Sequence, residues 1–263
     1  MDHDAQTPSR EIPETEILPV ENGVAEDRKQ APAEYFRCKV IQSFALYFGF
    51  ICWGLIFGTN GTTFLDLEIL TGATTDQITF TFVGSSIASF LSAIFAGAVI
   101  SKFNPWLLLA SDVFVTAIFH TAIPWSRSIV TLAAFHALRG FCMSFYNTGG
   151  NITLLNIWGK DNGPWMQALH FLFGVGGLLG PLIAKPFMYI DDEEDLNATM
   201  FLGNTSLNTN FTASPRREEI DLAEMKIWIA YLIVGTLITC GSIALFGIYL
   251  AGDRKFKQIR KEE

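Results

Sequence analysis

The chain has 263 residues, of which 50% are hydrophobic and 17% charged, and its formal net charge is −8. A soluble domain is about 25% charged, whereas residues 40–188 of this chain contain only ten charged side chains. That stretch is too apolar for a water-soluble domain, and the sequence has no basic patch with which to bind nucleic acid. The ten residues are Asp66, Glu68, Asp76, Lys102, Asp112, Arg127, Arg139, Lys160, Asp161 and Lys185.

Residues 1–38 differ sharply in composition from the rest of the chain. They contain nine acidic residues, four prolines and no aromatic residue before Tyr35. A segment this polar cannot bury enough apolar surface to fold, so we predict a disordered acidic tail. It contains no apolar core of a signal peptide, and we therefore expect the first apolar run to act as the signal anchor.

Six apolar runs come after this tail, each long enough to cross a bilayer, which takes about 20 residues. Lipid offers the backbone no hydrogen-bond partner, so such runs must be helices. The sequence therefore predicts an all-α membrane protein with six transmembrane helices over residues 39–252. The runs are Val40–Thr59, which ends in a loop, Ile78–Ile100, Trp106–Ile123, Ile129–Ile152, Pro164–Met188 and Ile227–Leu250.

Residues 189–226 form the longest connection between predicted helices. They contain three Asn-X-Ser/Thr sequons, at Asn197, Asn204 and Asn210. Three acceptor sites within one polar loop indicate glycosylation and an extracellular or lumenal position.

Basic residues near the helix ends agree with that orientation. They precede the first helix and follow the last, where residues 253–263 form a basic tail. Because basic flanks favour the cytoplasm, we predict cytoplasmic termini in a multi-pass protein of the plasma membrane.

Two charged residues lie well inside the predicted spans, Asp112 in the third and Arg139 in the fourth, whereas Lys185 is near the end of the fifth. Intramembrane charges usually face a cavity or one another. Arg139 is therefore either a cavity cation that binds a solute or the partner of Asp112. The two positions differ in depth by roughly 10 Å at 1.5 Å per residue, a gap that an arginine only partly closes.

The fifth and first helices carry the best candidates for contact with a solute. Gln167, His170 and Gly174 are three and four residues apart and share one helical face; Trp53 and Asn60 lie two turns apart on the first helix. With Asn147 on the fourth helix, they offer the aromatic surface and amides that bind a sugar. The alternatives are helix packing for the polar and glycine positions and an interfacial anchor for Trp53.

The soluble segments contain no nucleophile–base pair, metal-ligand spacing or phosphate-binding loop. We therefore expect neither an enzyme nor a bound cofactor. The predicted partners are the lipid bilayer and a small solute.

Three stretches resemble one branch of the major facilitator superfamily, the branch of the sodium-dependent glucose transporters and the domain-containing protein 4 group. They are GTTFLDL, TTDQITFTF and MQALHFLFGVGGLLGPLIAKPF. The resemblance implies the N-terminal six-helix half of a transporter fold whose substrate lies between two halves. It also implies alternating access and a possible coupling Na⁺, which neutral oxygens of Asn60, Thr62 or Asn147 would bind.

A weaker similarity, through Trp53-Gly54 and residues 147–151, joins the chain to bacterial fucose–proton symporters. The acids of those symporters correspond here to Gly61 and Asn147, so proton coupling through these positions is not expected.

Two functions are consistent with these features. The first is transport of a small neutral solute, a hexose, with a second six-helix half or as a homodimer. The second is a truncated half that does not transport but binds or regulates a full-length relative.

Overall fold

The computed structural model describes residues 21–189 and 225–262, with side chains for residues 33–189 and 225–252. The chain divides into two units, residues 1–38 and 39–263. The described part of the first unit is one helical segment, and the bundle of packed helices belongs to the second unit. The predicted loop sequons at Asn197, Asn204 and Asn210 lie outside the described residues.

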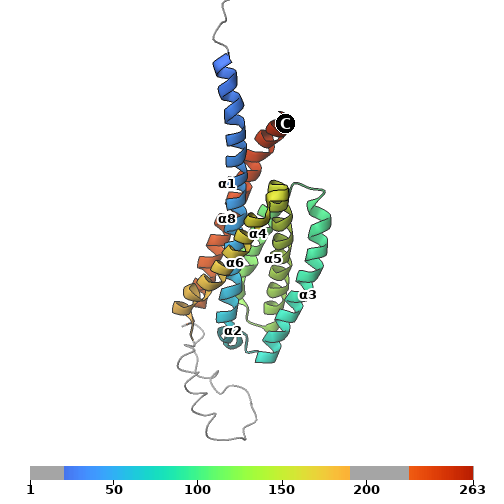
Figure 1. Ribbon diagram of the computed structural model, residues 1–263. Coiled ribbons are helices and arrows are strands. Elements are labelled where there is room, and N and C mark those ends of the chain that lie inside the picture. Colours follow the sequence, from blue (N-terminus) through green and yellow to red (C-terminus); the bar gives the residue numbers. More distant parts are fainter. Residues whose placement is uncertain (1–20, 190–224, 263) are drawn as a thin grey trace, which may run out of the picture. The chain divides into compact units, whose positions relative to one another are not determined.

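Every regular element that the structure describes is helical (Figure 1). Six of the helices are long and apolar enough to span a bilayer, which confirms the predicted fold class. Short 3₁₀ turns follow α4, α5 and α6. The helices are α1 Glu21–Thr62, α2 Phe64–Thr71, α3 Thr75–Ile100, α4 Pro105–Ala122, α5 Ile129–Trp158, α6 Gly163–Ala184 and α8 Ile227–Glu262.

The largest differences from the predicted helix bounds are three extensions. Helix α1 begins at Glu21, so residues 21–38 are helical where composition predicted disorder. Extending an existing helix adds one hydrogen bond per residue without a new nucleation cost, which allows a membrane helix to continue into a polar segment. For the same reason α8 continues through the basic residues to Glu262, and α5 runs on to Trp158.

The connection after the first span was predicted as a loop, and it contains helix α2 instead. Leu67 and Leu70 of this short helix are buried. The helix ends at Thr71. The next residue, Gly72, caps it, and its φ of 64° is a left-handed conformation that favours glycine. The prediction failed because α2 has only eight residues, too few to show the helical spacing of apolar residues in the sequence.

Helices α3 and α5 pack closely through small and hydroxyl residues. The Ser89 hydroxyl donates to the Gly140 carbonyl at 2.9 Å, and the Ser92 hydroxyl donates to the Phe141 carbonyl at 2.6 Å. In return, the Ser144 hydroxyl donates to the Ser89 carbonyl at 2.7 Å. These serines therefore join helices, as expected for small polar residues within a membrane.

Helices α1 and α6 approach one another through glycines. A Cβ added to Gly54 would overlap the Phe173 carbonyl oxygen, and one added to Gly176 would overlap that of Ile51. Gly58 and Gly180, one helical turn further along, are equally confined by backbone of the facing helix. Each helix thus carries two glycines four residues apart, the spacing that permits close helix contact in lipid.

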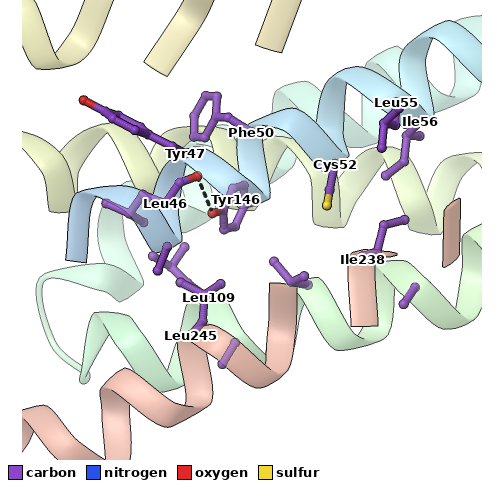
Figure 2. Close-up of a cluster of buried hydrophobic side chains, with 14 of the residues drawn as sticks. Leu46, Tyr47, Phe50, Cys52, Leu55, Ile56, Leu109, Tyr146, Ile238 and Leu245 are labelled. Atoms are coloured by element: carbon purple, nitrogen blue, oxygen red, sulfur yellow. Dashed lines mark hydrogen bonds between the residues drawn. The ribbon is translucent and has the colours of Figure 1, made fainter. Parts of the chain in front are cut away.

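The main apolar core surrounds α1 (Figure 2). Leu46, Phe50 and Ile56 of α1 are buried there against residues of α4, α5 and α8. The Tyr146 hydroxyl of α5 donates to the Leu46 carbonyl at 3.1 Å, so a polar tip is satisfied within the core. Helix α1 is consequently the element that most of the bundle shares.

Replacing Gly54 with alanine is expected to lower the free energy of unfolding by about 1–3 kcal/mol, since the new methyl group would overlap backbone that cannot move alone. Thermal unfolding of the purified protein in detergent measures the change. Gly84→Ala is the matched control, because nothing lies within 4 Å of its added Cβ. Equal melting temperatures for the two variants would contradict the close α1–α6 contact.

Candidate functional site

One face of α6 is uncovered and carries two polar side chains beside the exposed apolar residues Phe171 and Leu178. Gln167, His170 and Gly174 are all exposed, as expected for positions that share a face. On the opposite side, Leu169, Gly176 and Gly180 are buried. An amide and an imidazole are costly against lipid, so this face is suited to a water-filled cavity or to a further layer of protein.

Trp53 lies beside this face on α1. Its ring is 4.4 Å from that of Phe173, measured between centroids, and 5.6 Å from that of Phe50. The ring of His170 also reaches Phe50, at 6.0 Å. The indole Nε1 of Trp53 has no hydrogen-bond partner among the described residues. Trp53 and His170 therefore belong to one aromatic cluster, in which the indole N–H of Trp53 is buried and unpaired among the described residues.

Asn147 lies on α5, next in sequence to Tyr146, whose ring is 5.5 Å from that of Phe50. The side-chain amide of Asn151 donates to the backbone carbonyl of Asn147 at 2.8 Å and to its Oδ1 at 3.1 Å. The side chain of Asn147 is half-buried, so its own amide group can still donate.

Asn60 lies apart from this cluster, in a buried set of polar side chains. It is 7% exposed, and its Oδ1 accepts a 2.6 Å hydrogen bond from the guanidinium of Arg139. The Tyr231 hydroxyl of α8 donates to the same oxygen at 3.5 Å. The structure thus groups Trp53 with His170, with Gln167 one turn away, but assigns Asn60 an internal partner.

Arg139 is itself 3% exposed, and its partner in this structure is Asn60 instead of Asp112, which was the predicted alternative. Asp112 lies on α4, and the difference in depth along the two helices favours the amide of Asn60 as the nearer acceptor. Arg139 is also not an exposed cation in a cavity, which was the other possibility predicted from the sequence. Its charge is held within the bundle.

The polar set continues to two further helices. Thr63 and Tyr231 share a hydrogen bond of 2.8 Å, and the ring of His120 stacks on that of Tyr231 at 4.7 Å. This set, which we call the Arg139 cluster, comprises Asn60, Thr63, His120, Arg139 and Tyr231. The cluster connects α1, and Thr63 directly after it, with α4, α5 and α8.

The sequence prediction missed His120, Tyr231 and the nearby His136. The His136 Nδ1 bonds to the Thr81 hydroxyl at 2.9 Å, between α5 and α3. The available signal was a polar side chain within each of three apolar runs, but periodicity alone does not say which of them meet.

The described residues contain no group of three or more His, Cys, Asp or Glu side chains that could hold a metal ion. Of the oxygens predicted for Na⁺, Asn60 Oδ1 already accepts from a guanidinium, and Asn147 Oδ1 accepts from the Asn151 amide. The Thr62 hydroxyl donates to the Gly58 carbonyl at 2.8 Å, which leaves its oxygen lone pairs able to bind a cation. A second cation at Asn60 would be repelled by Arg139, so a sodium site there requires another conformation. Sodium coupling stays a prediction.

No protein-family model matches the chain. It is 30% identical over 213 residues to sodium-dependent glucose transporter 1 of Xenopus laevis, covering 76% of this chain and 41% of that protein. It is 30% identical to the Danio rerio protein of the same name, covering 79% of this chain and 35% of the relative. Major facilitator superfamily domain-containing protein 4A of Danio rerio is 33% identical, covering 61% and 29%. The chain thus spans about two fifths or less of the length of these relatives.

Replacing Asn60 with leucine is expected to lower the free energy of unfolding by about 2–3 kcal/mol, because it leaves a buried guanidinium without its acceptor. Melting temperatures in detergent test this. Asn60→Asp is the control, since it keeps an acceptor oxygen and adds an opposite charge. If Asn60→Leu were as stable as the wild type, the Arg139–Asn60 bond would not contribute to the fold.

Proposed function

Since the chain carries one six-helix half of a major facilitator fold and is similar to transporters of that type, we propose that it serves the transport of a small neutral solute by alternating access. The observation that carries this proposal is the uncovered polar face of α6, with Gln167 and His170 exposed. In major facilitator folds the solute site lies between two halves near the midplane. The α6 face meets the chemical requirement for one wall of such a site.

A neutral solute is favoured because the candidate contact residues carry no fixed charge. The buried guanidinium of Arg139 already has an amide partner, and Gln167, Trp53 and Asn147 are uncharged. Aromatic rings with neighbouring amides suit a sugar. The apolar C–H face of the sugar ring stacks on an aromatic ring, while the amides hydrogen-bond the hydroxyl groups of the sugar. A hexose is therefore the solute class that we propose, and it agrees with the names of the first two relatives.

The second wall of the site must come from six further helices. A second copy of this chain or a separate six-helix half would supply them. An amide and an imidazole at the surface of α6 would then be covered by protein and solute, not by lipid.

The proposed location is the plasma membrane, with the termini in the cytoplasm and residues 189–226 outside. The basic residues flanking the first and last spans and the sequons at Asn197, Asn204 and Asn210 support this orientation.

The second candidate is a six-helix half that does not transport but binds or regulates a full-length relative. Cross-linking in membranes separates the two. A stable homodimer favours a working transporter, and a mixed pair with a full-length relative favours a regulator.

Uptake of labelled hexoses into vesicles containing the full chain, with and without a sodium gradient, tests transport. We expect His170→Leu and Gln167→Leu each to lower the uptake rate roughly tenfold, the upper effect of one lost hydrogen bond to a neutral solute. The control is Ile87→Leu, an exposed apolar side chain on α3, a helix that contributes no residue to the proposed site. Failure of the wild type to take up any hexose would refute hexose transport by this chain.

Glycosylation tests the orientation. Expression in a eukaryotic cell should give a protein whose apparent mass on a gel falls when an N-glycosidase removes its glycans. Each change of Asn197, Asn204 or Asn210 to Gln should lower the apparent mass by that of one glycan. A wild-type band that the glycosidase leaves unchanged would place the loop on the cytoplasmic side or show that the sequons are unused.

A further inference from the structure

A groove runs between α4 and α8, on helices other than those of the candidate solute face. Its volume is about 420 Å³, and its walls include Phe114, Ile118 and Thr239. Phe114 and Ile118 are each 51% exposed. We call this the apolar groove.

A second groove of about 330 Å³ continues from it and shares two of its lining residues, Ala122 and Trp125. It lies where α4 ends and α5 begins, and it is lined by Ser126, Arg127 and Ser128. We call this the polar groove.

The apolar groove has the length of one leaflet. Phe114 lies near the middle of the span Pro105–Trp125, and Trp125 is at its end. At 1.5 Å per residue the two are roughly 16 Å apart along the helix. Half of a hydrocarbon core of about 30 Å is close to that value. An acyl chain lying in the apolar groove would therefore reach from the membrane boundary to the midplane.

The polar groove supplies donors at the membrane boundary. Ser126 is 2% exposed, and its hydroxyl has no hydrogen-bond partner among the described residues. The guanidinium of Arg127 is exposed beside it. Ser128 caps α5 by accepting from the Thr131 backbone N–H, while the first backbone N–H groups of that helix remain available to an anion.

No carboxylate lines either groove. A cation, a buried hydroxyl without a partner and a helix N-terminus together match a phosphate group. The apolar groove leading away from them matches a hydrocarbon chain.

We propose that the two grooves together bind one phospholipid, with its phosphate at Arg127 and Ser126 and one acyl chain between α4 and α8. The ligand comes from the bilayer, because the apolar groove lies along α4, a helix long and apolar enough to span it, and Phe114 and Ile118 are half exposed there. The site differs from the α6 face in position and in ligand chemistry, so it does not depend on the proposed transport function.

Native mass spectrometry of the full chain in detergent tests this site, with dioleoyl phosphatidylglycerol as the probe and dioleoylglycerol as the analogue that lacks phosphate. We expect one retained phosphatidylglycerol per chain and no comparable retention of dioleoylglycerol. Arg127→Gln should weaken retention about tenfold, the lower effect of losing a charge-assisted hydrogen bond.

The control for charge is Lys102→Gln, an exposed cation in the connection at the other end of α4, which should leave retention unchanged. Ile118→Trp should fill the apolar groove and also lower retention, whereas Ile87→Trp, an exposed site on α3, should not. Melting temperatures within a few degrees of the wild type verify that each variant is folded. Equal retention in wild type and Arg127→Gln, or of lipid with and without phosphate, would overturn the proposal.

Discussion

Hydrocarbon offers no hydrogen bonds, and this constraint explains most of the described structure. The backbone satisfies itself within helices, and the polar side chains then need partners from neighbouring helices. Serines of α3 and α5 use each other's carbonyl groups, and Arg139 uses Asn60. Buried polar groups therefore determine which helices touch, whereas apolar side chains meet lipid and protein almost equally well.

Helix α1 is where these contacts converge. Gly54 and Gly58 bring it against α6, Leu46 accepts from Tyr146 of α5, and Asn60 joins Arg139 and Tyr231. The same helix presents Trp53 to the aromatic cluster. Close backbone contact on one side and polar contacts at one end therefore fix the position of α1 in the bundle.

The polar groups separate into two kinds by their partners. In the Arg139 cluster, Asn60, Thr63, Arg139 and Tyr231 are joined by hydrogen bonds inside the bundle, and His120 stacks on the ring of Tyr231. Gln167 and His170 instead lie at the surface of α6. The guanidinium of Arg139 is buried and donates to Asn60 inside the bundle, so this charge does not lie on the uncovered face of α6. That face presents an amide and an imidazole instead.

The sequence by itself determined the number, type and approximate bounds of the spans, since long uncharged runs have one stable form in lipid. It also placed Gln167, His170 and Gly174 on one face, because helical spacing is a local property. It did not determine that Arg139 would bond to Asn60 and not to Asp112, or that His120 and Tyr231 would stack. Those pairings depend on the rotation and depth of separate helices. Only tertiary packing decides them, because it sets how helices far apart in the sequence are rotated and shifted against one another.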